Sequence, residues 1–123
     1  MIIEKSKILL IHRFNYGKEY FVLPGGGIKK NETPEMAAQR ELKEEVGLVV
    51  EIRKPFFEIE NRGQTEFYFS AERISGRMKK SFKEYRKNKN NRRLPVWKKL
   101  KEFYLLSNFY PPKAQKKIKE IIS

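Results

Sequence analysis

Apolar residues near the start of the chain form two short runs, KILLIHR at 7–13 and EYFVLP at 19–24. Both are rich in aliphatic and aromatic residues, and the stretch between them, which contains Gly17, has turn-forming chemistry. This pattern predicts a β-hairpin. Pro24 ends the second run, and the three glycines at 25–27 then predict an irregular loop.

The next segment carries the signals of a helix over residues 34–46. Thr33 supplies a hydroxyl at the N-cap position, Pro34 suits the first helical position, and Gly47 is a typical C-terminal stop. A helical wheel separates an apolar stripe from an acidic face beside it. The stripe consists of Ala38, Leu42 and Val46, and the acidic face of Glu41, Glu44 and Glu45. We expect the acidic face to lie outside the core.

Two further strands are expected after the helix, because apolar and polar residues alternate at 48–54 and again at 65–73. The segment 77–93 has little apolar content and predicts an exposed loop. Order is expected to resume at Leu94.

The last part of the sequence predicts two helices. A short one covers 99–106, and PPKAQKKIKEIIS at 111–123 starts with prolines and has apolar residues at helical spacing. The residues expected to face the body are Ala114, Ile118, Ile121 and Ile122. Strands that flank one helix, followed by more strands and terminal helices, predict an α+β fold, an α/β/α sandwich with a mixed β-sheet between helices.

Length and composition narrow the classes of protein. At 123 residues we expect a single domain over 1–123. The absence of cysteine excludes disulfides and thiolate sites, and the single histidine, His12, cannot form an imidazole cluster. The run ILLI at 8–11 is too short for a signal peptide. We expect a cytoplasmic protein with no membrane partner, whose oligomeric state the sequence leaves open.

Positive charge is concentrated in one segment. Residues 1–76 carry twelve lysines and arginines against twelve glutamates, whereas residues 77–101 carry twelve basic residues and one glutamate. Such a field attracts polyanions, from nucleotide phosphates to nucleic acid. A solvated surface loop that keeps the protein soluble accounts for the same pattern. Both interpretations stay open.

The acidic face has a chemical consequence. Its three glutamates stand at i, i+3 and i+4, where like charges repel unless a cation lies between them. Mg²⁺ prefers oxygen ligands and often shares them with substrate phosphates. Arg40 can hold one carboxylate through a charged hydrogen bond, and the glycine loop lets the backbone approach a ligand. These residues predict a divalent cation site.

The same residues match a known motif. Gly26, five residues, Glu32, seven residues and then RELKEEVGL at 40–48 fit GX5EX7REUXEEXGU at every fixed position, so the segment resembles the Nudix box. The lead-in FVLPGGG, the pair Val96-Trp97 and the terminal helix are also similar to small Nudix hydrolases. The resemblance implies the Nudix fold and metal-dependent hydrolysis of a nucleoside diphosphate linked to another group.

The resemblance also implies roles for individual residues. The carboxylates of Glu41, Glu44 and Glu45, with the backbone carbonyl of Gly25, would bind Mg²⁺ or Mn²⁺. Arg40 would orient Glu41 or Glu44, and either Glu41 or Glu45 would be the general base. Glu32 would assist structurally or in the outer metal shell, and Gly26 is a candidate contact of the substrate phosphate. Arg13 is a further candidate from its position at the end of its strand, where a surface role accounts for it equally. Some relatives draw a further metal ligand from a later loop, for which Glu84 is the candidate.

Substrate identity is not determined by the motif. The alternatives are a nucleoside triphosphate or related nucleotide, the 5′ end of an RNA held by the basic segment 77–101, and a non-catalytic module that binds nucleic acid. The aromatic residues available to stack on a base are Phe14, Tyr16, Phe67, Tyr68 and Phe69. Alternating aromatic residues in a strand normally pack against the neighbouring layer, so we expect most of them to belong to the core. The pattern also lacks a full first strand, since only MIIEKS precedes the first apolar run, so that strand is very short or another element fills the sheet edge.

Overall fold

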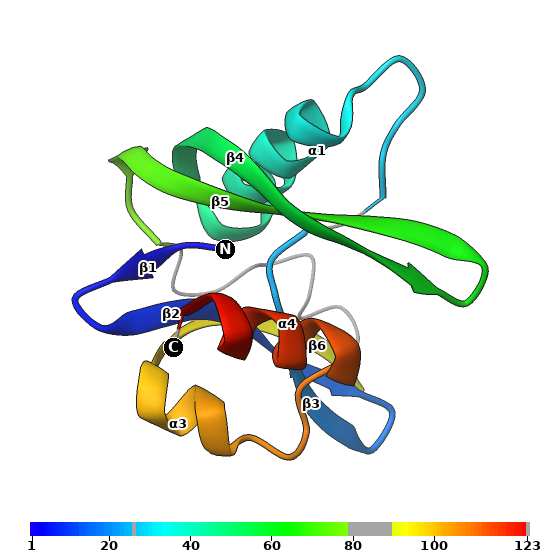
Figure 1. Ribbon diagram of the computed structural model, residues 1–123, viewed down its shortest axis with the longest axis vertical. Helices are drawn as coiled ribbons and strands as arrows, with labels where there is room; N and C mark the ends of the chain where they lie inside the picture. Colours follow the sequence, from blue (N-terminus) through cyan, green and yellow to red (C-terminus); the bar gives the residue numbers. More distant parts are fainter. Residues whose placement is uncertain (26, 79–89, 123) are drawn as a thin grey trace.

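The computed structural model describes residues 1–25, 27–78 and 90–122 (Figure 1). Its elements, in chain order, are β1 (Ile3–Glu4), β2 (Lys7–Asn15), β3 (Lys18–Val22), α1 (Pro34–Glu41), the π-helical turn η1 (Leu42–Val46), β4 (Leu48–Asn61), β5 (Gln64–Gly76), β6 (Asn91–Lys99), α3 (Leu100–Leu105) and α4 (Pro112–Ile122). Gly26 and the segment 79–89, which includes the candidate ligand Glu84, lie outside the described residues.

Strand β2 is the centre of the main sheet. It pairs with β6 along its whole length, and β1 and β3 share its other edge. These ladders are antiparallel, and an isolated parallel bridge joins Phe21 to Phe109. The two residues of β1 confirm that the first strand is very short, and β2 with β3 forms the predicted hairpin.

Alternate residues of β2 enter two separate cores. Ile8 and Leu10 pack against Phe103, Ala114 and Ile118 from the C-terminal helices. On the other face, Leu9 and Ile11 pack with residues of η1 and β4, namely Leu42, Val46, Leu48 and Val50. Because both faces are covered, β2 is apolar without alternation. The predicted α+β sandwich is therefore confirmed, with α1 on one side of the sheet and α3 on the other (Figure 1).

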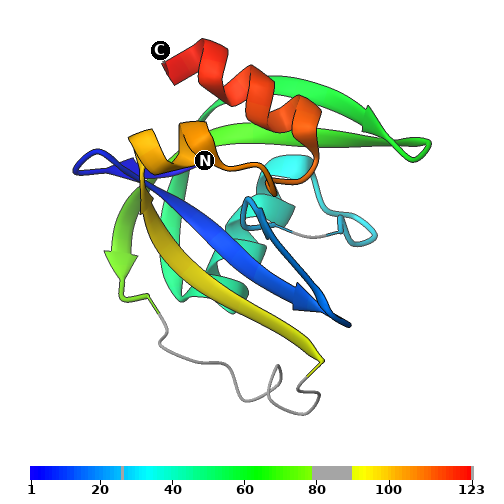
Figure 2. The ribbon, with the colours of Figure 1, turned by 90° about the horizontal axis from the view of Figure 1, so that it is seen from below.

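A second sheet is the long hairpin of β4 and β5, which turns at Arg62 and Gly63. The ladder is interrupted by three register shifts, which allow so long a pair to bend. The amide of Ala71 in β5 donates to the carbonyl of Met1 at 2.9 Å, so the hairpin is tied to the first residue of the chain. Figure 2 shows the hairpin extending beyond the main sheet, beside α4.

The predicted N-cap and C-terminal stop of the helix are both present in the structure. The Thr33 hydroxyl accepts a hydrogen bond from the Met36 amide at 3.1 Å, and Gly47 ends the helical segment at a φ of 90°. In α4, Ala114 and Ile118 are fully buried, but Ile121 is 42% exposed, so its predicted contact with the body is wrong. The described residues contain no helix long and apolar enough to span a membrane.

The start of β6 differs from the prediction. An exposed loop was expected to continue to residue 93, yet Asn91 to Arg93 already belong to β6 and pair with the end of β2. Pairing with the end of β2 outweighs the low apolar content of this stretch. Pro95 is tolerated because β6 pairs with β2 along one edge and needs no donor on the other.

Candidate active site

The acidic residues sit where α1 widens into the π-helical turn η1. The Gly47 amide closes the turn by donating to the carbonyls of Leu42 and Lys43, each at 3.0 Å. A π turn adds a residue to the helical repeat and changes which side chains face inward. Leu42, Glu45 and Val46 are buried here. The expectation that the acidic face lies wholly outside the core is therefore wrong for Glu45, which is 3% exposed.

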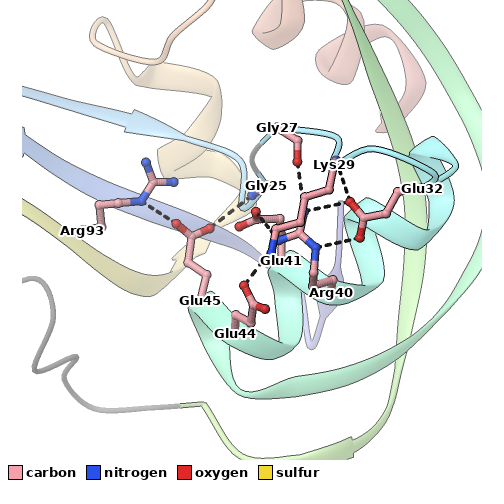
Figure 3. Close-up of polar contacts among 9 residues, drawn as sticks. All are labelled: Gly25, Gly27, Lys29, Glu32, Arg40, Glu41, Glu44, Glu45 and Arg93. Atoms are coloured by element: carbon pink, nitrogen blue, oxygen red, sulfur yellow. Dashed lines mark hydrogen bonds and ion pairs between the residues drawn. The ribbon is translucent and has the colours of Figure 1, made fainter.

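Glu45 joins the helix to two other parts of the fold (Figure 3). Its Oε1 accepts a hydrogen bond from the Gly25 amide at 3.2 Å, and its Oε2 accepts one from Nε of Arg93 in β6. Burial raises the pKa of the Glu45 carboxyl, although the positive charge and hydrogen bond of Arg93 oppose that rise. Glu45 is thus a buried carboxylate directly beside the glycine loop.

Arg40 organises the remaining acidic residues. It donates from Nη1 to Glu41 at 2.8 Å and to Glu44 at 3.3 Å. It also donates from Nε and Nη2 to the two carboxylate oxygens of Glu32, at 2.7 and 3.0 Å, and from Nη2 to the Gly27 carbonyl at 2.9 Å. One guanidinium therefore connects the helix with the glycine loop, and its role in orienting the carboxylates for a ligand stays a prediction.

Glu32 lies at the outer end of this network. Its Oε1 also accepts the Lys29 amide at 2.8 Å, which closes the turn before the helix. The hydrogen bonds from Arg40 and Lys29 lower the pKa of Glu32 to about 2. None of these bonds joins Glu32 to a predicted metal ligand. Glu32 instead holds Arg40 and the loop in place.

The donor set fits a hard divalent cation. Carboxylates and a backbone carbonyl are oxygen ligands of the kind that Mg²⁺ and Mn²⁺ take. Glu41 lies close enough to Glu45 for its negative charge to raise the pKa of Glu45. In the described part of the chain, however, no three acidic or histidine side chains gather as a ready-made metal site. The predicted convergence of Glu41, Glu44 and Glu45 on one point is therefore not found, since Glu44, 60% exposed, turns to Arg40.

Arg93, which bonds to the buried Glu45, was not among the residues predicted from the sequence. Arg93 lay in the predicted loop, and its contact with Glu45 spans 48 positions along the chain. The candidate phosphate contact Arg13 lies directly opposite Arg93 in the β2–β6 ladder, and it donates to the Asn91 side chain and to the Arg92 carbonyl. The sequence carries no local signal that places β6 beside β2. Arg93 can therefore be recognised only once the pairing of these two strands is known.

A cleft of about 590 Å³ opens beside the glycine loop, and the three glutamates of the acidic face are not among the residues that line it. Gly25 and Arg93, which both bond to Glu45, do line it, as does Gly27. Its apolar wall includes Phe67, Tyr68, Phe69 and Tyr110, and Phe67 and Tyr110 are 40% and 37% exposed. Of the aromatic residues predicted to be available to a base, Phe14 and Tyr16 are not among the residues that line this cleft.

Comparison with known proteins identifies a matching family and several relatives of this chain. The NUDIX domain family model matches residues 1–114. The chain is 52% identical over 54 residues to the ADP-ribose pyrophosphatase of Methanocaldococcus jannaschii, a match covering 42% of this chain and 32% of that protein. It is 51% identical over 45 residues to the RNA pyrophosphohydrolase of a Marinomonas species, covering 37% of this chain and 27% of that protein. The matches thus span less than a third of either relative.

Solved structures share the fold. A Nudix hydrolase from Nitrosomonas europaea superimposes with a TM-score of 0.73 at 22% identity, over 98% of this chain and 82% of that one. A hydrolase of the NUDIX family from Clostridium perfringens gives a TM-score of 0.69 at 21% identity, over 99% of this chain and 93% of that one. At these identities the likeness establishes the architecture alone.

Proposed function

Because the chain belongs to the Nudix family, we propose that it hydrolyses the diphosphate bond of a nucleoside diphosphate linked to another group, with Mg²⁺ or Mn²⁺ as cofactor. The observation that carries the proposal is the position of Glu45. The carboxylate of Glu45 is 3% exposed and is bonded to the Gly25 amide and to Arg93, both of which line a cleft. A buried carboxyl whose pKa is raised, next to a cleft, is typical of a functional site.

The position of each residue suggests its role in the proposed reaction. Glu41, Glu44, Glu45 and the carbonyl of Gly25 would hold the cation, and Arg40 would orient Glu41. Glu44 would have to leave Arg40, its partner in the structure, to join the cation. Bound there, Mg²⁺ or Mn²⁺ would polarise the diphosphate and lower the pKa of an attacking water. Glu41 or Glu45 would accept the proton from that water. Glu32 would act indirectly, by fixing Arg40 and the loop.

The cleft favours a nucleotide as the substrate. Its exposed aromatic side chains, Phe67 and Tyr110, offer surfaces on which a base can stack, and Arg93, which bonds to Glu45, lines the same cleft and offers a positive charge to a phosphate. The test is release of phosphate or nucleoside monophosphate from a panel of nucleoside triphosphates, ADP-ribose and a dinucleoside polyphosphate, with Mg²⁺. Turnover of one member identifies the class, and no turnover on any member contradicts the proposal for small nucleotides.

A second substrate, the 5′ end of an RNA, is favoured by the basic segment 77–101. Its described residues include Lys98 and Lys99 of β6, the strand that also carries Arg93. The relative from Marinomonas is named for this activity. The test is pyrophosphate release from a 5′-triphosphorylated RNA at increasing salt, because a polyanion held by several cations loses affinity steeply as salt rises. RNA binding without turnover would instead indicate the non-catalytic module.

A further inference from the structure

Two arginines face each other in the main sheet. Arg13 of β2 and Arg93 of β6 are directly opposite partners in the antiparallel ladder. Side chains at such positions point to the same face and lie close together, and like charges directly opposite are destabilising. We call these two residues the arginine pair. The carboxylate of Glu45 offsets the charge of Arg93, and an anion between the two side chains would relieve the remaining repulsion.

The face that carries the arginine pair is the face of the carboxylates. Leu9 and Ile11 of β2 pack toward η1, and Arg13 is the next residue on that side of the strand. Trp97 of β6 packs into the same core, and Arg93 lies four residues before it, on the same side. The bond from Arg93 to Glu45 confirms the direction. The arginine pair therefore lies across the site from the acidic helix.

The two arginines have different partners. Arg13 is held by the Asn91 side chain and the Arg92 carbonyl, within the sheet. Arg93, 23% exposed, donates its Nε to the buried Glu45, and its two terminal nitrogens point away from that carboxylate (Figure 3). Arg93 also lines the cleft. It is thus already directed at the space where a substrate phosphate would enter.

We propose that Arg13 and Arg93 together bind one phosphate group of the substrate, and that Arg93 exchanges Glu45 for that phosphate when Glu45 takes a divalent cation. This inference rests on the proposed function for the identity of the ligand. In the cation-free protein Arg93 neutralises Glu45, which would otherwise be a buried charge without compensation. Once Glu45 has a cation, a guanidinium on the same carboxylate is repelled, and a phosphate beside Arg13 becomes the better partner.

The exchange predicts opposite effects on two ligands. Removing Arg93 should strengthen binding of the cation, because its competitor for Glu45 is gone, and weaken binding of the phosphate. Removing Arg13 should weaken phosphate binding alone, since Arg13 makes no described bond to Glu45. Arg92 gives a matched control, because it carries the same charge on the same strand but lies over the ring of Phe14, on the opposite face.

The experiment measures binding rather than turnover. Mn²⁺ affinity is determined from the electron paramagnetic resonance signal of the free ion, and affinity for inorganic imidodiphosphate by calorimetry at saturating Mg²⁺. The proteins are the wild type, Arg93→Ala, Arg93→Lys, Arg13→Ala and Arg92→Ala. We expect Arg93→Ala to bind Mn²⁺ about threefold to tenfold more tightly, and both Arg93→Ala and Arg13→Ala to bind imidodiphosphate about tenfold more weakly. Arg92→Ala should behave as the wild type does.

Arg93→Lys shows whether the effects of Arg93→Ala come from the lost side chain or from a disrupted fold. It keeps a positive charge near Glu45, so its Mn²⁺ affinity should stay close to that of the wild type while imidodiphosphate binding falls part of the way. The inference is overturned if Arg93→Ala binds Mn²⁺ no more tightly than Arg92→Ala does, or if imidodiphosphate affinity is unchanged in both Arg93→Ala and Arg13→Ala. Neither affinity measurement requires hydrolysis. If the wild type hydrolyses no nucleotide, the proposed function is contradicted, but the two affinities still test this inference.

Discussion

Arg40 donates two parallel hydrogen bonds to the carboxylate of Glu32, from Nε at 2.7 Å and from Nη2 at 3.0 Å. The same guanidinium reaches the carboxylate of Glu41 and the carbonyl of Gly27, so one side chain connects the acidic helix with the glycine loop. A planar fork can make these bonds at once, whereas an ammonium group cannot. Much of the geometry of the site therefore depends on the shape of Arg40 as well as on its charge.

Replacing Arg40 by lysine should therefore damage the site although the charge is kept. We expect kcat/KM to fall about 10- to 100-fold, the usual effect of removing a group that orients ligands. Steady-state hydrolysis of the best nucleotide measures this. Arg53→Lys is the matched control, because Arg53 pairs with exposed glutamates on the β4–β5 hairpin. Equal activities of the two variants would show that Arg40 acts through charge alone or not at all.

Glu32 should make stability depend on pH in the acid range. Its pKa is lowered from 4.5 to about 2 in the folded protein by the bonds from Arg40 and Lys29. Because the folded value lies below the unfolded one, this interaction stabilises the fold above the unfolded pKa and is lost as the pH falls through the folded pKa. The free energy of unfolding of Glu32→Gln should lie below that of the wild type near neutral pH, and the gap should close toward pH 2.

Urea unfolding followed by circular dichroism at several pH values tests this. Glu58→Gln, which removes an exposed carboxylate of β4, serves as the control. A gap between Glu32→Gln and the wild type that stays constant with pH would count against the ion pair as its cause.

The glycine at the end of β5 should resist substitution more than the glycine of the hairpin turn. Gly76 has a φ of +95°, and an added Cβ would lie 2.4 Å from the carbonyl oxygen of Gly47, which ends the acidic helix. Gly63 has a similar φ of +77° but open space around it. Gly63→Ala should cost about 1–2 kcal/mol from backbone strain alone, and Gly76→Ala a further ~1–3 kcal/mol from the clash.

Thermal and urea unfolding of these two variants give the comparison directly. If both lost the same stability, the close approach of β5 to the end of the helix would be absent in solution.

Divalent cations should stabilise the fold through the acidic residues. A ligand that binds only the folded chain raises stability by about 2.7 kcal/mol at a hundred times its Kd. Added Mn²⁺ should raise the Tm of the wild type, and a chelator should reverse the change. Glu41→Gln should show a smaller rise, and Glu58→Gln the full one. A rise of equal size in all three proteins would place cation binding elsewhere on the molecule.

Local chemistry explains what the sequence predicts well. The Thr33 cap, the Gly47 stop and the hairpin before Pro24 depend on residues within a few positions of one another, and the structure has all of them. The spacing of the glutamates is also a local property. It identified the acidic face, and the bonds from Arg40 to Glu41 and Glu44 follow from it.

What the sequence does not predict depends on contacts between distant segments. The end of β2 recruits residues 91–93 into a strand although they are polar, and this pairing delivers Arg93 to Glu45. The π turn at 42–46 is likewise set by packing against the sheet, because Leu42 and Val46 enter the core together with Glu45. A wheel of ideal geometry therefore placed Glu45 on the surface, where the structure buries it.

The proposed function requires the carboxylate of Glu45 to belong to a hydrolytic active site. The decisive comparison is between Glu45→Gln and Glu58→Gln on the best nucleotide of the panel, with Mg²⁺ and at equal protein concentration. We predict that Glu45→Gln loses about 10²-fold or more in kcat while Glu58→Gln keeps the wild-type rate. A folded Glu45→Gln protein that hydrolyses the nucleotide as fast as the wild type would contradict the account.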